Sequence, residues 1–90
     1  MRLLTRFRPT QQQTVTLYSR PGCHLCEDAR QLLVHLSPKF RIEINEVDIT
    51  SDPDLVRRYD IRIPVMVFPN GRELEAPIRE SDVRRELRRR

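Results

Sequence analysis

The chain has 90 residues and a formal net charge of +4 at pH 7; 33% of its residues are charged and 38% are hydrophobic. This length suits one small domain, and no apolar run approaches the roughly 20 residues of a transmembrane helix. The composition therefore argues against a membrane-spanning chain, and we expect no membrane partner.

The N-terminal segment carries Arg2, Arg6 and Arg8, but it has neither the apolar core nor the cleavage site of a secretory signal. Its proline and its three consecutive glutamines predict a flexible extension over residues 1–13, followed by a domain over 14–90. A clipped organellar transit peptide is the alternative. Two cysteines without an export signal favour the cytoplasm, where such a pair is more often catalytic or metal-binding than structural.

A strand, a turn and a helix follow in this order. Residues 15–18 alternate as a half-buried strand does, and the Arg-Pro-Gly sequence at 20–22 predicts a turn. From Cys26 onward, apolar residues recur at helical spacing and predict a helix, with a break at Ser37-Pro38. The apolar residues of this helix are Ala29, Leu32, Leu33 and Leu36.

Cys23 and Cys26 are the only cysteines, and they lie at the start of this helix. A thiol there faces unpaired backbone N–H groups and the positive end of the helix dipole, and both favour the thiolate. Because the thiolate is the species that attacks disulfides, the placement predicts a redox pair. Two alternatives stay open: two small buried side chains, or metal ligands. Two thiolates plus His24 are too few for zinc or an iron–sulfur cluster unless two chains share the site.

A second strand is predicted from residue 40, where Phe40, Ile42 and Ile44 alternate with polar residues. The apolar phase then slips around Asn45-Glu46, which predicts a bulge or the end of the strand. A strand, a helix and a second strand within so short a stretch indicate a parallel βαβ unit with a right-handed crossover.

A short helix and a hairpin come next. Asp52 is placed to cap the short helix, with a proline at the following position. Residues 61–68 predict a strand led by Pro64. The Asn-Gly pair at 70–71 predicts a turn that returns the chain as a last strand over 72–75.

The final helix is expected to have Ser81 as its cap. Val83 and Leu87 lie four residues apart and form its inner face, while Glu86 and Arg90 pair on its outer face. The end of this helix is rich in arginine, but no aromatic residues alternate with the arginines. We interpret it as a solvated helix end and expect no nucleic-acid partner.

The resulting order, β-α-β-α-β-β-α, predicts an α/β fold with a four-stranded mixed sheet between helices. Together with the Cys-x-x-Cys sequence after the first strand, this order resembles the thioredoxin fold. Within that fold, the chain is similar to the small glutaredoxin-like proteins that carry Cys-His-Leu-Cys, over about residues 14–88. The segments that carry the resemblance are residues 17–29, 47–49 and 59–65, with Gly71.

The resemblance implies a thiol–disulfide oxidoreductase without a cofactor or metal, in which Cys23 is the nucleophile and Cys26 resolves the mixed disulfide. Ile63-Pro64 matches the cis-proline position that faces the active cysteines and docks an extended substrate, with an ordinary trans proline at a strand start as the alternative. Arg20 stands where glutaredoxins have a lysine that meets the glutathione carboxylate. His24, if protonated, favours a thiolate nearby. For Arg20 and His24, a surface residue without a role in binding is the alternative.

Two departures limit what the resemblance carries over. Residues 75–78 occupy the place of the Gly-Gly and Asp that hold glutathione, and only Ser81-Asp82 is placed to substitute. The chain also lacks tryptophan and has Leu17 where thioredoxins carry a buried carboxylate. We therefore expect a monomer that reduces protein or small-molecule disulfides and binds glutathione weakly. A non-catalytic binding module, or a metal or iron–sulfur carrier with a site shared by a dimer, are the alternatives.

Overall fold

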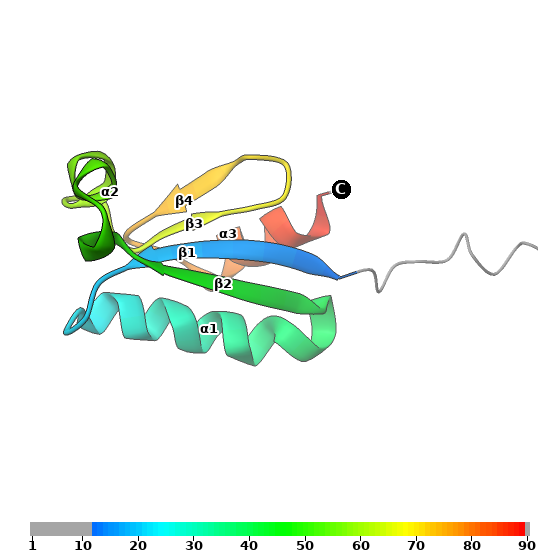
Figure 1. Cartoon of the computed structure of the whole chain (residues 1–90). Helices are drawn as coiled ribbons and strands as arrows, with labels where there is room; N and C mark the ends of the chain where they lie inside the picture. Colours follow the sequence, from blue (N-terminus) through cyan, green and yellow to red (C-terminus); the bar gives the residue numbers. More distant parts are fainter. Residues whose placement is uncertain (1–11, 90) are drawn as a thin grey trace, which may run out of the picture.

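A four-stranded sheet in the order β2-β1-β3-β4 forms the centre of the structure, a computed structural model that describes residues 12–89 (Figure 1). Its strands are β1 (Gln13–Ser19), β2 (Ile42–Asp48), β3 (Val65–Val67) and β4 (Glu73–Glu75). Its helices are α1 (His24–Phe40), the short 3-10 helix η2 (Ile49–Ser51), α2 (Pro53–Tyr59) and α3 (Glu80–Arg88). β1 pairs parallel with β2 and antiparallel with β3, which pairs antiparallel with β4. The predicted β-α-β-α-β-β-α order and the mixed sheet are confirmed.

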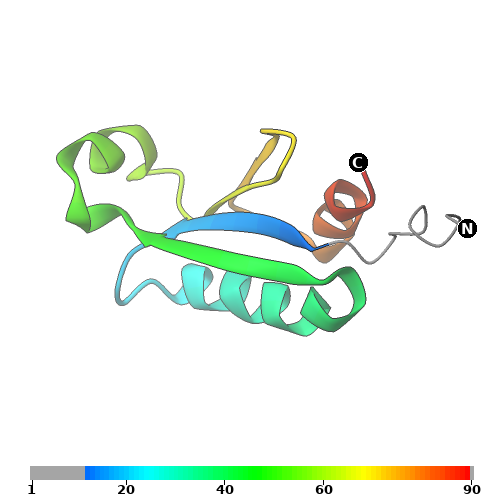
Figure 2. The same cartoon turned by 45° about the vertical axis from the view of Figure 1, so that its right-hand side comes forward.

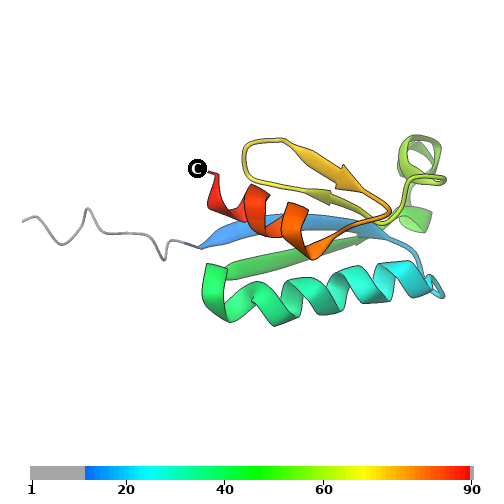
Figure 3. The same cartoon turned by 180° about the vertical axis from the view of Figure 1, so that it is seen from behind.

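α1 and α3 cover the same face of the sheet, as the view from behind shows (Figure 3). Alternate side chains of β1 and β3 point toward this face, because side chains alternate along a strand. They form one core cluster with apolar residues of both helices. Its buried members include Val15, Leu17, Leu33, Leu36, Met66, Val83 and Leu87. This packing fixes α1 against β1, so the turn that joins them is held at one end of the sheet.

α2 lies at that same end of the molecule and packs on a second, smaller core cluster (Figure 2). Tyr59 of α2 is buried there with Ile49 and Val65. Its ring stacks on that of Tyr18 in β1, with the ring centroids 4.2 Å apart. Tyr18 and Val65 are register partners, and their side chains point to the face of the sheet opposite α1. The end of the sheet where β1 stops is therefore covered on both faces.

α1 runs through Ser37 and Pro38 to Phe40, so the predicted break at Ser37-Pro38 is wrong. Pro38 lies in the last turn, where its missing N–H removes one hydrogen bond close to the end of the helix. The helix ends at Arg41, whose left-handed backbone (φ 53°) lets its N–H donate to the Ser37 carbonyl at 2.6 Å.

The predicted bulge in β2 is wrong, because β1 and β2 pair residue by residue along all seven positions of each strand. The apolar phase of the sequence slips because Glu46 takes a position facing α1, where its carboxylate accepts hydrogen bonds from Arg30. β2 ends at Asp48, whose side chain caps η2 by accepting the N–H of Thr50 at 2.8 Å.

The third strand is shorter than the predicted 61–68 and covers only the three residues of β3. The chain before it forms a turn that continues the end of α2, because the N–H groups of Arg62 and Ile63 both donate to the Tyr59 carbonyl, at 2.8 and 3.0 Å. Ile61 in this turn is 96% exposed. The apolar stretch 61–68 thus contains both a turn and a strand. The alternation of its side chains does not show where the turn ends and the strand begins.

The predicted Asn-Gly turn joins β3 to β4. Gly71 adopts a positive φ of 87°, which glycine reaches without steric strain. Its N–H donates to the Phe68 carbonyl at 2.8 Å, and the Phe68 N–H donates to the Arg72 carbonyl at 2.9 Å. β4 lies within the predicted range 72–75.

α3 begins earlier than predicted, with Arg79 as its N-cap residue and no capping side chain, so the predicted Ser81 cap is wrong. The Arg79 carbonyl accepts the N–H groups of Asp82 and Val83, each at 3.1 Å, and so starts the helix. Glu80 and Asp82 place negative charge in the first turn, where it favours the positive end of the helix dipole.

Glu86 is buried, with 5% of its surface exposed, so its predicted position on the outer face of α3 is wrong. Its carboxylate pairs with Arg72 of the hairpin at 3.0 Å and with Arg89 at 3.4 Å. The hairpin therefore lies against the helix face that the sequence pattern marks as polar. The predicted partner, Arg90, lies outside the described residues.

Residues 1–11, most of the predicted N-terminal extension, also lie outside the described residues. β1 starts at Gln13, the last residue assigned to that extension, and the Gln13 side chain is 8% exposed. Its amide donates to the Leu87 carbonyl at 3.1 Å, which ties the start of the sheet to α3. Among residues 12–89, no helix combines the length and the apolar character needed to cross a bilayer.

Candidate active site

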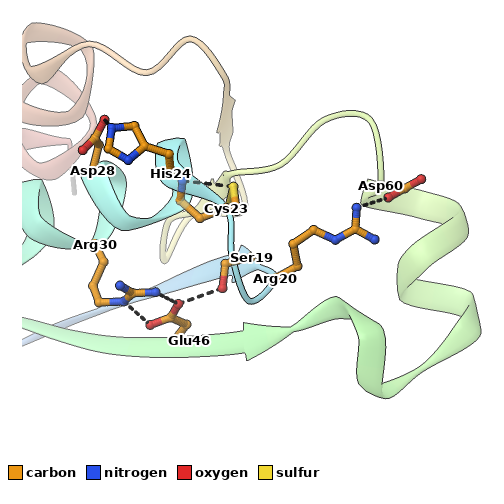
Figure 4. Close-up of a disulfide and its surroundings, with 9 residues drawn as sticks. Ser19, Arg20, Cys23, His24, Asp28, Arg30, Glu46 and Asp60 are labelled. Atoms are coloured by element: carbon orange, nitrogen blue, oxygen red, sulfur yellow. Dashed lines mark hydrogen bonds and ion pairs between the residues drawn. A yellow bond between two sulfur atoms is a disulfide. The ribbon is translucent and has the colours of Figure 1, made fainter.

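Cys23 and Cys26 form a disulfide at the N-terminus of α1, with their Cα atoms 5.2 Å apart (Figure 4). The turn before them contains Gly22, which adopts a positive φ of 75° and carries the chain from β1 into the helix. Cys26 is completely buried against the core, whereas Cys23 is partly exposed. The structure therefore describes the oxidised pair, with Cys23 partly open to solvent and Cys26 buried.

Cys23 is the N-cap residue of α1, and its sulfur accepts the Cys26 N–H at 3.1 Å. Its carbonyl accepts the Glu27 N–H at 3.1 Å, which completes the first turn. A sulfur in this position receives a backbone hydrogen bond and faces the positive end of the helix dipole. Both interactions strengthen when the sulfur is an anion, so the site favours a Cys23 thiolate once the disulfide is reduced.

A partly exposed hydrogen-bond network lies beneath the turn that carries Cys23 (Figure 4). The Glu46 carboxylate of β2 accepts two hydrogen bonds from Arg30 of α1, at 2.7 and 2.6 Å, and one from the Ser19 hydroxyl of β1 at 2.7 Å. The bonds from Arg30 and Ser19 hold the pKa of the Glu46 carboxyl below its usual value. One carboxylate thus joins the ends of β1 and β2 to α1 and fixes the geometry of the turn between them.

Glu46 was not among the predicted site residues, because the thioredoxin carboxylate belongs to the first strand, where this chain has Leu17. In the sheet, Glu46 is the register partner of Leu17 on the neighbouring strand. The available signal was the polar residue that interrupts the apolar alternation of β2, together with an arginine one helical turn after Cys26.

Arg20 pairs with Asp60, its Nη1 nitrogen lying 3.0 Å from the carboxylate, and the two side chains are 40% and 44% exposed. In Figure 4 the guanidinium points toward Asp60 and away from the Cys23 sulfur. The pair joins the active-site turn to the loop that follows α2. Nothing in the sequence pattern indicated Asp60 as a partner.

His24 is mostly exposed, with 85% of its side chain accessible. Its Nε2 lies 3.9 Å from a carboxylate oxygen of Asp28, one turn along α1. Figure 4 shows the imidazole directed toward Asp28 rather than toward the sulfur of Cys23. The neighbour of the His24 imidazole is therefore the Asp28 carboxylate.

The Ile63–Pro64 peptide bond is cis, as the sequence predicts, and Pro64 is buried. The turn that precedes it is held by Arg62, which pairs with Glu73 and Glu75 of β4 at 2.6 and 2.9 Å. The Arg62 guanidinium also lies 5.2 Å from the centre of the Tyr59 ring. These contacts fix the segment before β3 relative to the sheet.

A groove of about 370 Å³ lies beside the cysteine motif, between the start of α1 and the segment that joins β4 to α3. Most of its lining is apolar, and its two ionisable residues are Asp28 and Glu80. The residues that line it are Leu25, Asp28, Ala29, Leu32, Pro64, Ala76, Pro77, Ile78 and Glu80. The groove therefore presents on one surface both Pro64 and Leu25, the residue that precedes Cys26.

Ser81 and Asp82, the predicted substitutes for the glutathione motif, do not line this groove. Asp82 instead pairs with Arg85 on α3 at 3.1 Å. Among residues 12–89, no three His, Cys, Asp or Glu side chains gather in a way that would hold a metal ion. A metal or cluster shared between two copies of the chain stays an untested alternative.

Comparison with known proteins places the fold and the cysteine motif in a family. The model of the glutaredoxin-like domain family (DUF836) matches residues 14–88. The crystal structure of target protein XcR50 from X. campestris is similar over 82% of this chain and 89% of its own, with 36% identity and a TM-score of 0.65. The solution structure of protein Ne2328 from Nitrosomonas europaea is similar over 81% of this chain and 88% of its own, with 29% identity and a TM-score of 0.70.

Mitochondrial thioredoxin 3 from Saccharomyces cerevisiae, in its oxidised form, matches the fold with a TM-score of 0.62. At 18% identity, over 93% of this chain and 87% of the thioredoxin, this likeness concerns the fold alone. The comparison with curated proteins finds no match for the chain. The family and the thioredoxin fold expected from the sequence are confirmed.

Proposed function

Because the chain belongs to the glutaredoxin-like domain family (DUF836), we propose that it is a thiol–disulfide oxidoreductase. The observation that carries this proposal is the disulfide between a partly exposed N-cap cysteine, Cys23, and a buried cysteine in the first turn, Cys26. A purely structural disulfide has no need of a helix N-terminus that favours the thiolate. Burial of Cys26 suits the resolving role, since that thiol reacts only with a disulfide already formed on Cys23.

The reaction starts from the reduced protein. The Cys23 thiolate attacks one sulfur of the substrate disulfide, a mixed disulfide forms, and the other substrate sulfur leaves as a thiolate and takes up a proton. The Cys26 thiol then loses its proton and attacks the Cys23 sulfur, which releases the second substrate thiol. Two electrons pass to the substrate, and the protein is left with the Cys23–Cys26 disulfide. An external thiol reductant returns the electrons and regenerates the dithiol.

Four other residues have proposed roles in substrate binding. Ile63 and Pro64 would present backbone and apolar surface to the substrate, a role supported by the position of Pro64 in the groove beside the motif. His24 directly follows Cys23, and Arg20 precedes Cys23 by three residues. The pairing of Arg20 with Asp60 leaves less of its charge for an anionic substrate, which supports the expectation that glutathione binds weakly.

We further propose that the protein is located in the cytoplasm and is a monomer. The reducing cytoplasm suits a dithiol that must be regenerated, and fluorescence imaging of the tagged full chain tests this location. A monomer is expected, and sedimentation at several protein concentrations tests it. A dimer that contains zinc or an iron–sulfur cluster would favour the carrier alternative instead.

The test of the enzymatic proposal compares the wild type with Cys23→Ser and Cys26→Ser. With dithiothreitol as reductant and a small dialkyl disulfide as substrate, we expect the wild type to accelerate the reaction above its uncatalysed rate and Cys23→Ser to leave that rate unchanged. When reduced Cys26→Ser, freed of dithiothreitol, is treated with the same disulfide, it should accumulate a mixed disulfide, which intact-mass spectrometry detects as the added half of the substrate on Cys23. If Cys23→Ser catalyses the reaction as fast as the wild type, Cys23 is not the nucleophile.

A further inference from the structure

The groove beside the cysteines has a charge of its own. Its floor is apolar, with Leu32, Pro64 and Ile78 contributing, and Leu25 at its edge is 57% exposed. Its two ionisable residues, Asp28 and Glu80, are both acidic. Their side chains are 58% and 46% exposed, so the carboxylates are accessible to whatever enters the groove.

Neighbouring cations offset these carboxylates only in part. Within the described residues, His24 is the one ion-pair partner of Asp28, at 3.9 Å, and both side chains are mostly exposed, so solvent screens the pair. Glu80 pairs with Arg84 at 2.8 Å, and Arg84 does not line the groove. The groove therefore presents at least one uncompensated negative charge beside an apolar surface.

The same carboxylates make the groove unfavourable for an anionic ligand. The N-termini of α1 and α3 both lie at this groove, and the unpaired N–H groups of a helix N-terminus attract anions. Glu80 is the first residue of α3, whose N-cap residue provides no side-chain cap. The Glu80 carboxylate already supplies negative charge at the N-terminus of α3. The Asp28 carboxylate adds a second negative charge to the groove, from α1. An incoming carboxylate would meet like charge instead of open N–H groups.

We propose that this groove binds the segment next to the target cysteine of a peptide or protein disulfide, and that it prefers an apolar residue accompanied by lysine or arginine. The inference deepens the proposed function and rests on it. The apolar floor takes the apolar side chain, while Asp28 and Glu80 attract the cation. The same arrangement disfavours glutathione, whose two carboxylates give it a net negative charge at neutral pH.

The experiment uses two short peptides that differ at one position. Each has one cysteine activated as a neutral 2-pyridyl disulfide and flanked by leucine, followed by lysine in one peptide and glutamate in the other. Attack by Cys23 on the peptide sulfur releases pyridine-2-thione, whose absorbance gives the second-order rate constant for the reduced protein. The ratio of the two rate constants within one protein sample is independent of the fraction that is active.

Intrinsic differences in peptide reactivity are removed by comparing proteins. The test variant, Asp28→Asn with Glu80→Gln, removes two carboxylates of the groove, and the control, Glu43→Gln, removes one exposed carboxylate of β2 outside the groove. We expect the lysine-to-glutamate ratio of the wild type to exceed that of the double variant by about two- to fivefold, the scale of exposed charge pairs. Glu43→Gln should keep the wild-type ratio, and added salt should shrink the difference.

Equal ratios for the wild type and the double variant would overturn the inference and leave the oxidoreductase proposal intact. Loss of the preference in Glu43→Gln would also overturn it, because the effect would then come from overall charge. Failure of the wild type to release pyridine-2-thione from either peptide would instead contradict the proposed function itself.

Discussion

The pair formed by Arg30 and Glu46 should stabilise the protein more than an ordinary surface ion pair. The two side chains are 39% and 30% exposed, and the guanidinium donates two hydrogen bonds, at 2.7 and 2.6 Å, to the carboxylate. Exposed ion pairs contribute about 0.2–1 kcal/mol to the free energy of unfolding. The bidentate geometry places the Arg30–Glu46 pair near the upper limit, at about 1 kcal/mol. Asp54 and Arg57 provide the internal control, since their side chains are 72% and 70% exposed and should couple by about 0.3 kcal/mol.

The perturbation is a double-mutant cycle of Arg30→Gln and Glu46→Gln, with Arg57→Gln and Asp54→Asn as the matched cycle. Urea unfolding at pH 7 gives the free energy of unfolding of each variant. For Glu46→Gln, a loss of about 1 kcal/mol corresponds to a fall in Tm of about 4–8 °C in a domain of this size.

The pH dependence supplies a second readout. Hydrogen bonds from Arg30 lower the pKa of Glu46 in the folded protein, so its contribution is complete above the unfolded pKa of about 4.3. The contribution is lost as the pH falls through the lower folded pKa. The difference between the wild type and Glu46→Gln should therefore be large at pH 7 and shrink in acid. A coupling energy no larger than that of the control pair, or a difference that does not change with pH, would refute the reasoning.

Three further predictions concern single residues. Iodoacetamide should label Cys23 of the reduced protein faster than Cys26, because one sulfur is partly exposed and the other is buried; peptide mass spectrometry after partial labelling checks the order. Activity in a glutathione-coupled assay should be poor, and Arg20→Ala should weaken what remains; saturation at low-millimolar glutathione would contradict this. Tyr59→Ala should destabilise the fold by about 3 kcal/mol, since the buried ring stacks on Tyr18, and urea unfolding measures the loss.

The sequence predicts the order of the elements because each carries a local signal. The alternation at 15–18, the helical spacing from Cys26 and the Asn-Gly turn at 70–71 depend on neighbouring residues alone. The errors arise where long-range packing decides. Pro38 stays inside α1 because a proline near a helix end costs little, and residues 61–63 form a turn because the N–H groups of Arg62 and Ile63 donate to the Tyr59 carbonyl.

In the candidate site, too, local motifs were predictable and long-range contacts were not. The Cys23–Cys26 pair and the cis bond before Pro64 were predictable, because a short motif and its place in the fold carry them. The partners of these residues were not. Glu46 reaches the active-site turn from a neighbouring strand, and Asp60 reaches Arg20 from the loop after α2. Such pairings depend on strand register and loop position, which charge patterns along the chain do not specify.

The most direct test of the account is an equilibrium redox titration of the Cys23–Cys26 pair. The fraction of oxidised protein is measured by thiol alkylation in dithiol buffers of defined potential. The helix N-terminus favours the reduced thiolate, while Glu27 and Asp28 oppose it, so we expect one two-electron transition near the thioredoxin and glutaredoxin range, about −270 to −200 mV. A potential below about −300 mV is typical of structural disulfides, and such a value, or the absence of any transition, would contradict the account.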